Sequence, residues 1–205
     1  MVAPLMEELA RLLPAVPRPF ETDAPGIWHI SGSALAGSAG PETNLFIDPL
    51  TGRRELNAPM LLFPSVEDFV LSARVEVDFH GTFDAGALVL HQDPSHWAKL
   101  CFEYSPAHQP MMVSVVTRGV SDDCNSAVLT NRSVYLRIAR IDGGYAFHYS
   151  AGGQRDWQMV RLFALPAQPT KAGFLVQSPR GEGCKITFSE INYRQTTLAD
   201  IRSGE

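Results

Sequence analysis

The chain contains few cysteines, and they do not form a recognisable pattern. Cys101, Cys124 and Cys184 are the only three among 205 residues. An odd count without a C-x-x-C pair argues against a disulfide framework and favours free thiols in a reducing compartment. We therefore expect a cytoplasmic protein.

Long apolar runs and clusters of one charge are also missing. Glu7, Glu8 and Arg11 interrupt the first residues, so no secretory signal is expected. No apolar run approaches the roughly 18–20 residues of a membrane span. The net charge is -5, from 17 basic and 22 acidic residues, and neither sign forms a long run. Nucleic acid and membrane surfaces are therefore not expected partners, because both require clustered lysine and arginine.

The composition predicts one folded domain. Apolar residues make up 45% and charged residues 19% of the chain, which is enough to form a sizeable core. Residues 1–19 should form an N-terminal helix and a proline-rich lead-in. The helix, Pro4–Leu13, places its leucines on one side. That apolar side would either dock on the domain or contact a protein partner, for example in a homodimer.

From Phe20 onward the hydrophobic period changes to two, which is typical of strands. Phe69–Phe79 alternates apolar and polar residues, and Asp142-Gly143-Gly144 is a hairpin turn signal. Roughly a dozen such segments predict an all-β fold, a two-sheet antiparallel sandwich or jelly roll. We assign residues 20–195 to this single domain and 196–205 to a C-terminal tail.

Alternation also predicts which side chains face away from the interior. If the strands near 98–104, 134–141, 145–150, 157–163 and 172–177 are neighbours in one sheet, they form a shared polar face with tryptophans at its ends. Such a face suits a polyhydroxylated ligand, because polar groups pair with hydroxyls and indoles stack on sugar rings. The alternative is that this face is simply the solvent-exposed side of an antiparallel sheet. The residues on it are Lys99, Glu103, Arg137, His148, Arg161 and Gln177, flanked by Trp97 and Trp157.

The order of several short motifs resembles a known family. The motifs are F-x-G-T-F-D-A-G-A-L-V-L, H-W-A-K-L-C-F-E, V-S-V-V-T-R-G-V-S-D-D, L-R-I-A-R, F-H-Y-S, D-W-Q-M-V-R and A-G-F-L-V-Q-S-P. Together they resemble the regulation-of-enolase proteins, and the resemblance extends from Gly26 to Tyr193. It implies a concanavalin A-like jelly roll with a groove that also includes Thr117, Ser121, Asp122 and Ser150. The family's early Thr-Asp-aromatic pattern appears here as Thr43-Asn44-Leu45-Phe46, with asparagine in place of the acid.

Candidate chemistry centres on Glu103. Lys99 on the same strand face should lower the pKa of Glu103, which suits a base or a ligand clamp. Glycosidases on such folds need a second carboxylate, which only Asp122 or Asp123 could supply. Lys99 and His148 are the other candidate catalytic residues. Cys101 is either an apolar filler or a reactive thiol.

We expect no cofactor and no metal site, since the histidines lack the spacing of a zinc set. A calcium ion held by loop oxygens near Asp48 or Asp93 is left open. The favoured function is binding of a small polar molecule, a carbohydrate or sugar-like metabolite. The alternatives are a sugar-acting hydrolase or isomerase that uses Glu103, and a protein-interaction module.

Overall fold

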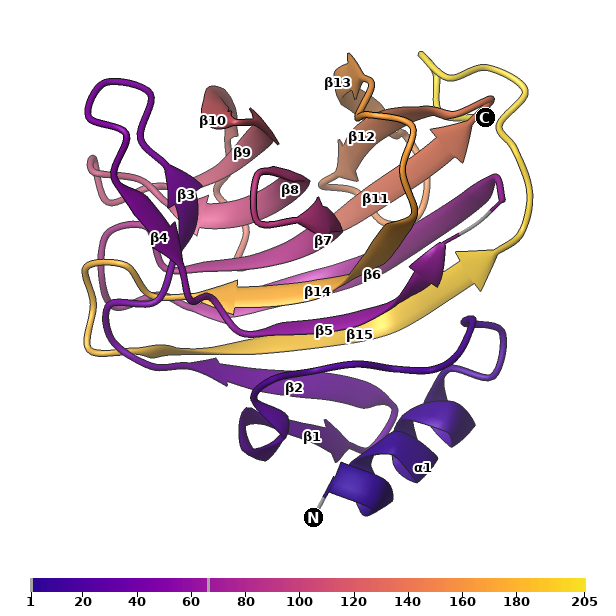
Figure 1. The fold of residues 1–205 in the computed structure, drawn as a ribbon, viewed down its shortest axis with the longest axis horizontal. Coiled ribbons are helices and arrows are strands. Elements are labelled where there is room, and N and C mark those ends of the chain that lie inside the picture. The colour runs from indigo at the N-terminus through magenta and orange to yellow at the C-terminus, as the bar shows by residue number, and fades with distance from the viewer. Residues whose placement is uncertain (1, 66) are drawn as a thin grey trace.

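The structure, a computed structural model, describes residues 2–65 and 67–205. It confirms the two-sheet antiparallel β-sandwich with a short N-terminal helix (Figure 1). The helix α1 spans Val2–Leu12, and a 3-10 turn follows at Pro25–Ile27. Within the described residues, no helix combines the length and the apolar character needed to cross a bilayer.

One sheet has seven strands in the order β1-β2-β15-β6-β11-β12-β13. In that order the strands span Trp28–Ser31 (β1), Ala34–Ala39 (β2), Cys184–Arg194 (β15), Phe69–Asp78 (β6), Ser133–Ile141 (β11), Gly144–Ser150 (β12) and Gln158–Phe163 (β13). The other sheet has six strands in the order β10-β9-β8-β7-β14-β5. These span Val120–Val128 (β10), Pro110–Arg118 (β9), His96–Tyr104 (β8), Ala85–Asp93 (β7), Thr170–Gln177 (β14) and Met60–Ser65 (β5). A separate hairpin pairs Leu45–Ile47 (β3) with Arg54–Leu56 (β4).

The polar composition of residues 118–125 predicts a loop, and this prediction is wrong: most of these residues belong to β10, an edge strand paired with β9. Burial explains the error, because Ser121 is buried whereas most of its neighbours on β10 are exposed. An edge strand of this kind has one covered face and little apolar content, so its composition looks like that of a loop.

The buried apolar side chains form two clusters. The main core lies between the sheets and includes Leu100, Phe102, Leu136 and Phe147. The leucine side of α1 joins it, since Leu9 is fully buried. A smaller cluster lies on the outer face of the six-stranded sheet, beneath the β3–β4 hairpin. It contains Leu45, Ile47, Ala58, Leu62, Ala85, Ala87, Val89, Trp97, Cys101, Val113, Val115 and Leu175.

Candidate functional site

The predicted single polar face is split between two sheets. Along β8 the alternation was right: Leu100 and Phe102 enter the main core, while Cys101 joins the outer cluster. However, β8 and β14 belong to the six-stranded sheet, whereas β11, β12 and β13 belong to the seven-stranded sheet. Side chains that point away from the common core therefore lie on opposite outer faces. The expectation that Lys99 and Glu103 share a trough with Arg137 and His148 is wrong.

On the six-stranded sheet, Lys99, Glu103 and Gln177 form one buried polar group. Lys99 donates from Nζ to Oε1 of Gln177 at 2.7 Å. The Gln177 amide nitrogen donates to the Phe83 carbonyl at 3.1 Å and faces Glu103 Oε2 at 3.4 Å. Lys99 is only 2% exposed, so its ammonium carries its charge inside the protein. A buried charge of this kind is expensive unless a partner or a function accounts for it.

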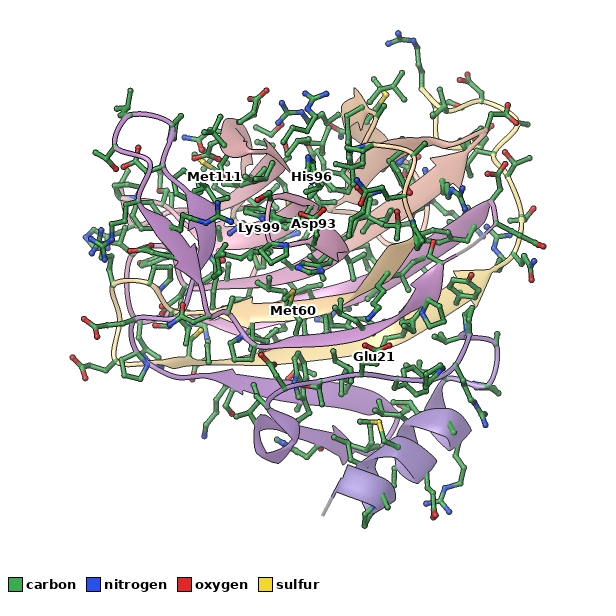
Figure 2. All side chains as sticks on the ribbon, viewed as in Figure 1. Glu21, Met60, Asp93, His96, Lys99 and Met111 are labelled. Carbon is green, nitrogen blue, oxygen red and sulfur yellow. The ribbon has the colours of Figure 1, made fainter. Side chains whose placement is uncertain are left out.

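A cavity of about 110 Å³ opens beside these three residues, and Asn44, Phe46, Phe83, Val115 and Asp123 complete its lining. Asn44, Phe46 and Phe83 also line a second cavity of about 190 Å³, which continues toward Asp48 and Arg180. In Figure 2, Lys99 lies on the six-stranded sheet next to the β3–β4 hairpin, whose Phe46 lines the same cavity. The polar group therefore lies at the inner end of a groove between hairpin and sheet.

Burial reverses the expected direction of the pKa shift of Glu103. Desolvation is the largest effect, and with Asp123 it outweighs the attraction of Lys99, raising the pKa of Glu103 to about 8. The pKa of Asp123 is also raised, again mainly by burial. Lys99 does lower the pKa of Glu103, as we expected. The net shift is upward, however, so the expected direction of the shift was wrong. At neutral pH, Glu103 is protonated and can donate a hydrogen bond or a proton.

Phe83 adds backbone strain to the same site. Its φ of 69° lies in the left-handed region, where bulky residues are rare. The backbone is held there from both sides, because Phe83 N donates to the Tyr104 carbonyl at 2.7 Å and its own carbonyl accepts from Gln177. Strain of this kind concentrates at functional sites.

Three predicted ligand contacts instead support the hairpin or its surroundings. Thr117 and Ser121 share a hydrogen bond of 2.9 Å, and Ser121 Oγ accepts from Ile47 N at 2.9 Å, which fixes β3. Trp97 is fully buried, so its indole face is not open for stacking. A ligand contact of these residues remains a prediction that would require the hairpin to move.

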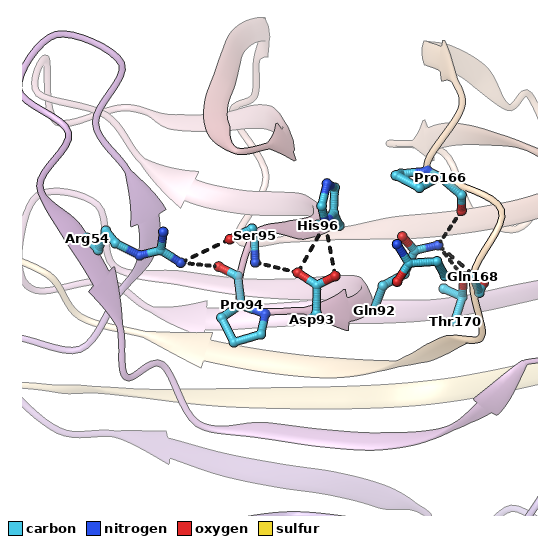
Figure 3. A network of polar contacts seen from close by, with 9 residues as sticks. All are labelled: Arg54, Gln92, Asp93, Pro94, Ser95, His96, Pro166, Gln168 and Thr170. Atoms are coloured by element: carbon cyan, nitrogen blue, oxygen red, sulfur yellow. Dashed lines mark hydrogen bonds and ion pairs between the residues drawn. The ribbon is translucent and has the colours of Figure 1, made fainter.

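The far end of the hairpin is fixed by the turn between β7 and β8 (Figure 3). Arg54 donates to the Pro94 carbonyl at 2.9 Å and to Ser95 Oγ at 3.2 Å. Asp93 accepts from Ser95 N and pairs with His96, so its oxygens serve the turn. Asp48 does the same in its own turn, accepting from Leu50 N at 2.7 Å. The hairpin is therefore anchored to the β7–β8 turn through Arg54 and to β10 through Ser121.

The remaining predicted residues lie on or beside the seven-stranded sheet. Arg161 reaches from β13 to β10, where it pairs with Asp122 at 2.8 Å. A register shift in the β12–β13 pairing turns Arg161 toward the sandwich edge and leaves Leu162 48% exposed, the reverse of the expected orientation. A separate group lies around β11 and β12, in the other sheet from the Lys99 pocket. It consists of Arg137, His148, Ser150 and Trp157.

Cys101 lies on the pocket side but is buried, and burial raises its pKa well above the usual range. This favours the apolar-filler reading over a reactive thiol. The pocket residues that sequence reasoning missed are Phe83 and Val115. Asn44 and Phe46 had a signal in the Thr43-Asn44-Leu45-Phe46 stretch, and Asp123 had one as a possible second carboxylate.

Comparison with known proteins identifies the fold and the family. A crystal structure of a functionally unknown protein from Saccharomyces cerevisiae is 22% identical with a TM-score of 0.78, over 88% of this chain and 97% of that one. The GH43 protein BlXynB from Bacillus licheniformis is 12% identical with a TM-score of 0.66, over 86% of this chain but 37% of that protein. The carbohydrate-binding module CBM66 from Bacillus subtilis is 12% identical with a TM-score of 0.55, over 85% of this chain and 94% of the module.

These neighbours share the jelly-roll sandwich. No functionally curated protein matches the chain. The family model described as "Protein of unknown function (DUF1349)" matches residues 22–196, which is most of the chain. The chain therefore belongs to the DUF1349 family.

Proposed function

We propose that the groove beneath the β3–β4 hairpin binds a small carbohydrate or sugar-like metabolite. The observation that carries the proposal is the buried Lys99 ammonium, which has one hydrogen bond to Gln177 and lines a cavity beside a protonated Glu103. Lysine can donate three hydrogen bonds and protonated glutamate one, so the inner end of the groove offers free donors to hydroxyl oxygens.

The shape of the groove limits the ligand. The inner cavity of about 110 Å³ is smaller than the roughly 300–1,000 Å³ of a typical ligand site. A sugar would therefore extend into the adjoining cavity of about 190 Å³, past Phe46 and Phe83. Phe46 and Phe83 would supply apolar contact there. The CBM66 neighbour is a carbohydrate-binding module, and several others are GH43 enzymes, which supports sugars as the ligand class.

We expect Lys99→Met to weaken sugar binding at least tenfold, which is about 1.4 kcal/mol. D-xylose, L-arabinose and D-glucose are suitable probes, measured by titration calorimetry. Methionine has an unbranched stem of similar length without the charge, so the change removes the ammonium and its hydrogen bonds while largely conserving the volume. Lys171→Met is the matched control, because Lys171 lies on the same sheet but pairs with Glu21 at the surface. Equal affinity in wild type and Lys99→Met would exclude this site.

A second candidate is a sugar-acting hydrolase or isomerase with Glu103 as the proton donor. The raised pKa of Glu103, with Asp123 in the same pocket, favours it, because catalytic acids are tuned in this way. If it is correct, Glu103→Gln should lower turnover of a xylose- or arabinose-based chromogenic glycoside by 10²-fold or more, while binding persists. Asp78→Asn, a surface change, should leave turnover unchanged. Activity that survives Glu103→Gln would remove the enzyme hypothesis and leave the binding hypothesis intact.

The resemblance to regulation-of-enolase proteins gives a third candidate, a regulatory interaction with another protein. The leucine side of α1 is buried in the chain's own core, so a partner or a second copy would have to use the exposed side that carries Glu7, Glu8 and Arg11. A cytoplasmic location remains a prediction from the cysteines.

A further inference from the structure

The C-terminal segment, residues 196–205, lies on the outer face of the seven-stranded sheet. It leaves the end of β15 and turns back beside β11 and β12 (Figure 1). Arg137 Nη1 donates to the Gly204 carbonyl at 2.7 Å. His148 Nε2 lies 2.7 Å from the Ile201 carbonyl, and because a carbonyl can only accept, Nε2 carries the proton. The segment is closed on itself, since Gly204 N donates to the Asp200 carbonyl at 2.9 Å.

Arg137 beneath this segment is a buried cation without an anion. It is 3% exposed, and Nε and Nη2 have no hydrogen-bond partner among the residues that the structure describes. No carboxylate within that part of the chain lies within 4.0 Å of it. Burial, and after it the positive charge of Arg194, lowers the pKa of Arg137 to about 10. One neutral carbonyl is poor compensation for a buried guanidinium.

Two neighbours give the site its shape. The guanidinium carbon of Arg137 lies 4.2 Å from the centre of the Trp157 ring, so the indole covers one face of the guanidinium. The donors at the edge of the guanidinium then determine what it binds. His148 Nδ1 is buried and has no partner among the described residues. With the proton on Nε2, Nδ1 is an acceptor and Nε2 is the donor that faces the segment.

We propose that Arg137, Trp157 and His148 form a second binding site, specific for a hydroxylated carboxylate, which residues 196–205 occupy when the ligand is absent. A carboxylate offers two anionic oxygens to the guanidinium fork, where the Gly204 carbonyl offers one neutral oxygen. A hydroxyl oxygen on the same ligand accepts from His148 Nε2 in place of the Ile201 carbonyl. The segment and the ligand compete for Arg137, so the apparent affinity depends on how firmly the segment is held.

Gly204→Ala should displace the segment without changing the site. A Cβ at Gly204 would overlap Arg137 Nη2 and lie 2.8 Å from Trp157 Cβ, and the φ of +79° is unfavourable for alanine. Gly143→Ala is the matched control, because Gly143 also has a φ of +79° but no atom lies within 4 Å of its Cβ position. Both variants carry the same backbone strain, and only Gly204→Ala collides with Arg137.

The experiment is calorimetric titration with D-glucuronate and with D-glucose, which share a ring and differ in the carboxylate. We expect Gly204→Ala to bind glucuronate at least tenfold more tightly than wild type or Gly143→Ala, with no such gain for glucose. Adding Arg137→Gln should abolish the gain. If that double variant does not fold, Arg137→Lys should lose most of the gain, because it keeps the charge without the fork.

Trypsin cleavage after Arg202 reports the position of the segment and should be faster in Gly204→Ala. Faster cleavage without a gain in glucuronate affinity would make the segment a structural cover only and overturn the proposal. Unchanged cleavage would overturn the claim that the segment can be displaced. A gain that survives Arg137→Gln would place the ligand elsewhere, the Lys99 pocket included.

Discussion

Glu103→Gln should stabilise the protein by roughly 3–5 kcal/mol at pH 9 and change its stability little at pH 4.5. Burial raises the pKa of Glu103 from 4.5 to about 8 in the folded protein. Between pH 4.5 and about pH 8 the folded state keeps a proton on Glu103 that the unfolded state releases. The wild type therefore loses stability as the pH rises through this window. Glutamine keeps the shape and cannot ionise, so it avoids the loss. Urea unfolding at both pH values measures the difference.

The control for this experiment is Glu182→Gln, an exposed glutamate on the loop before β15. A surface change of this type should alter the free energy of unfolding by less than about 0.5 kcal/mol at either pH. If Glu103→Gln gave the same small, pH-independent effect, the carboxyl group of Glu103 would be ionised or hydrated in the folded protein. The proton-donor role would then have no basis.

Asp84→Ala should destabilise the protein by roughly 3–5 kcal/mol. Asp84 is fully buried and accepts from His80 N at 2.9 Å, Gly81 N at 2.7 Å and Ser178 Oγ at 2.6 Å. Alanine would leave these donors without partners inside the protein. The Asp84 contacts join the turn before β7 to the loop after β14, and both carry lining residues of the groove, Phe83 and Arg180. Sugar affinity should therefore fall together with stability.

Asp84→Asn and Asp78→Ala calibrate this result by urea unfolding. Asparagine keeps one acceptor oxygen and should recover part of the lost stability. Asp78 has a side chain that is 65% exposed, and its replacement by alanine should cost less than about 1 kcal/mol. A cost for Asp84→Ala no larger than that for Asp78→Ala would mean that the two loops are held together by other contacts.

The sequence was sufficient for the fold class and for the orientation of strands such as β8, but not for β13, where a register shift leaves Leu162 exposed. Alternation along residues 98–104 correctly predicted that Lys99, Cys101 and Glu103 point away from the common core. Alternation is a property of one strand, however, and two sheets have two outer faces. Which strands are neighbours depends on long-range pairing, such as that of β14 with β7, which no local pattern records.

The cover of the pocket was not predictable for a related reason. β3 and β4 have three residues each, too few for periodicity, and their position depends on single contacts such as Ser121 Oγ to Ile47 N. That cover buries Glu103, so the net pKa depends on it. From the sequence, the Lys99 charge four residues away was visible, whereas the desolvation of Glu103 was not. The balance between them could not be judged before the hairpin was placed.

The central claim is that the groove end formed by Lys99, Glu103 and Gln177 is a buried ligand site. The most direct test is carbon-13 NMR of the Glu103 carboxyl group, titrated from pH 4 to pH 10 with and without the sugar that binds most tightly in calorimetry. We predict a midpoint near 8 in the free protein and a displaced carboxyl resonance and midpoint when the sugar is bound. A midpoint near 4.5 that no sugar moves would contradict both the burial and the site.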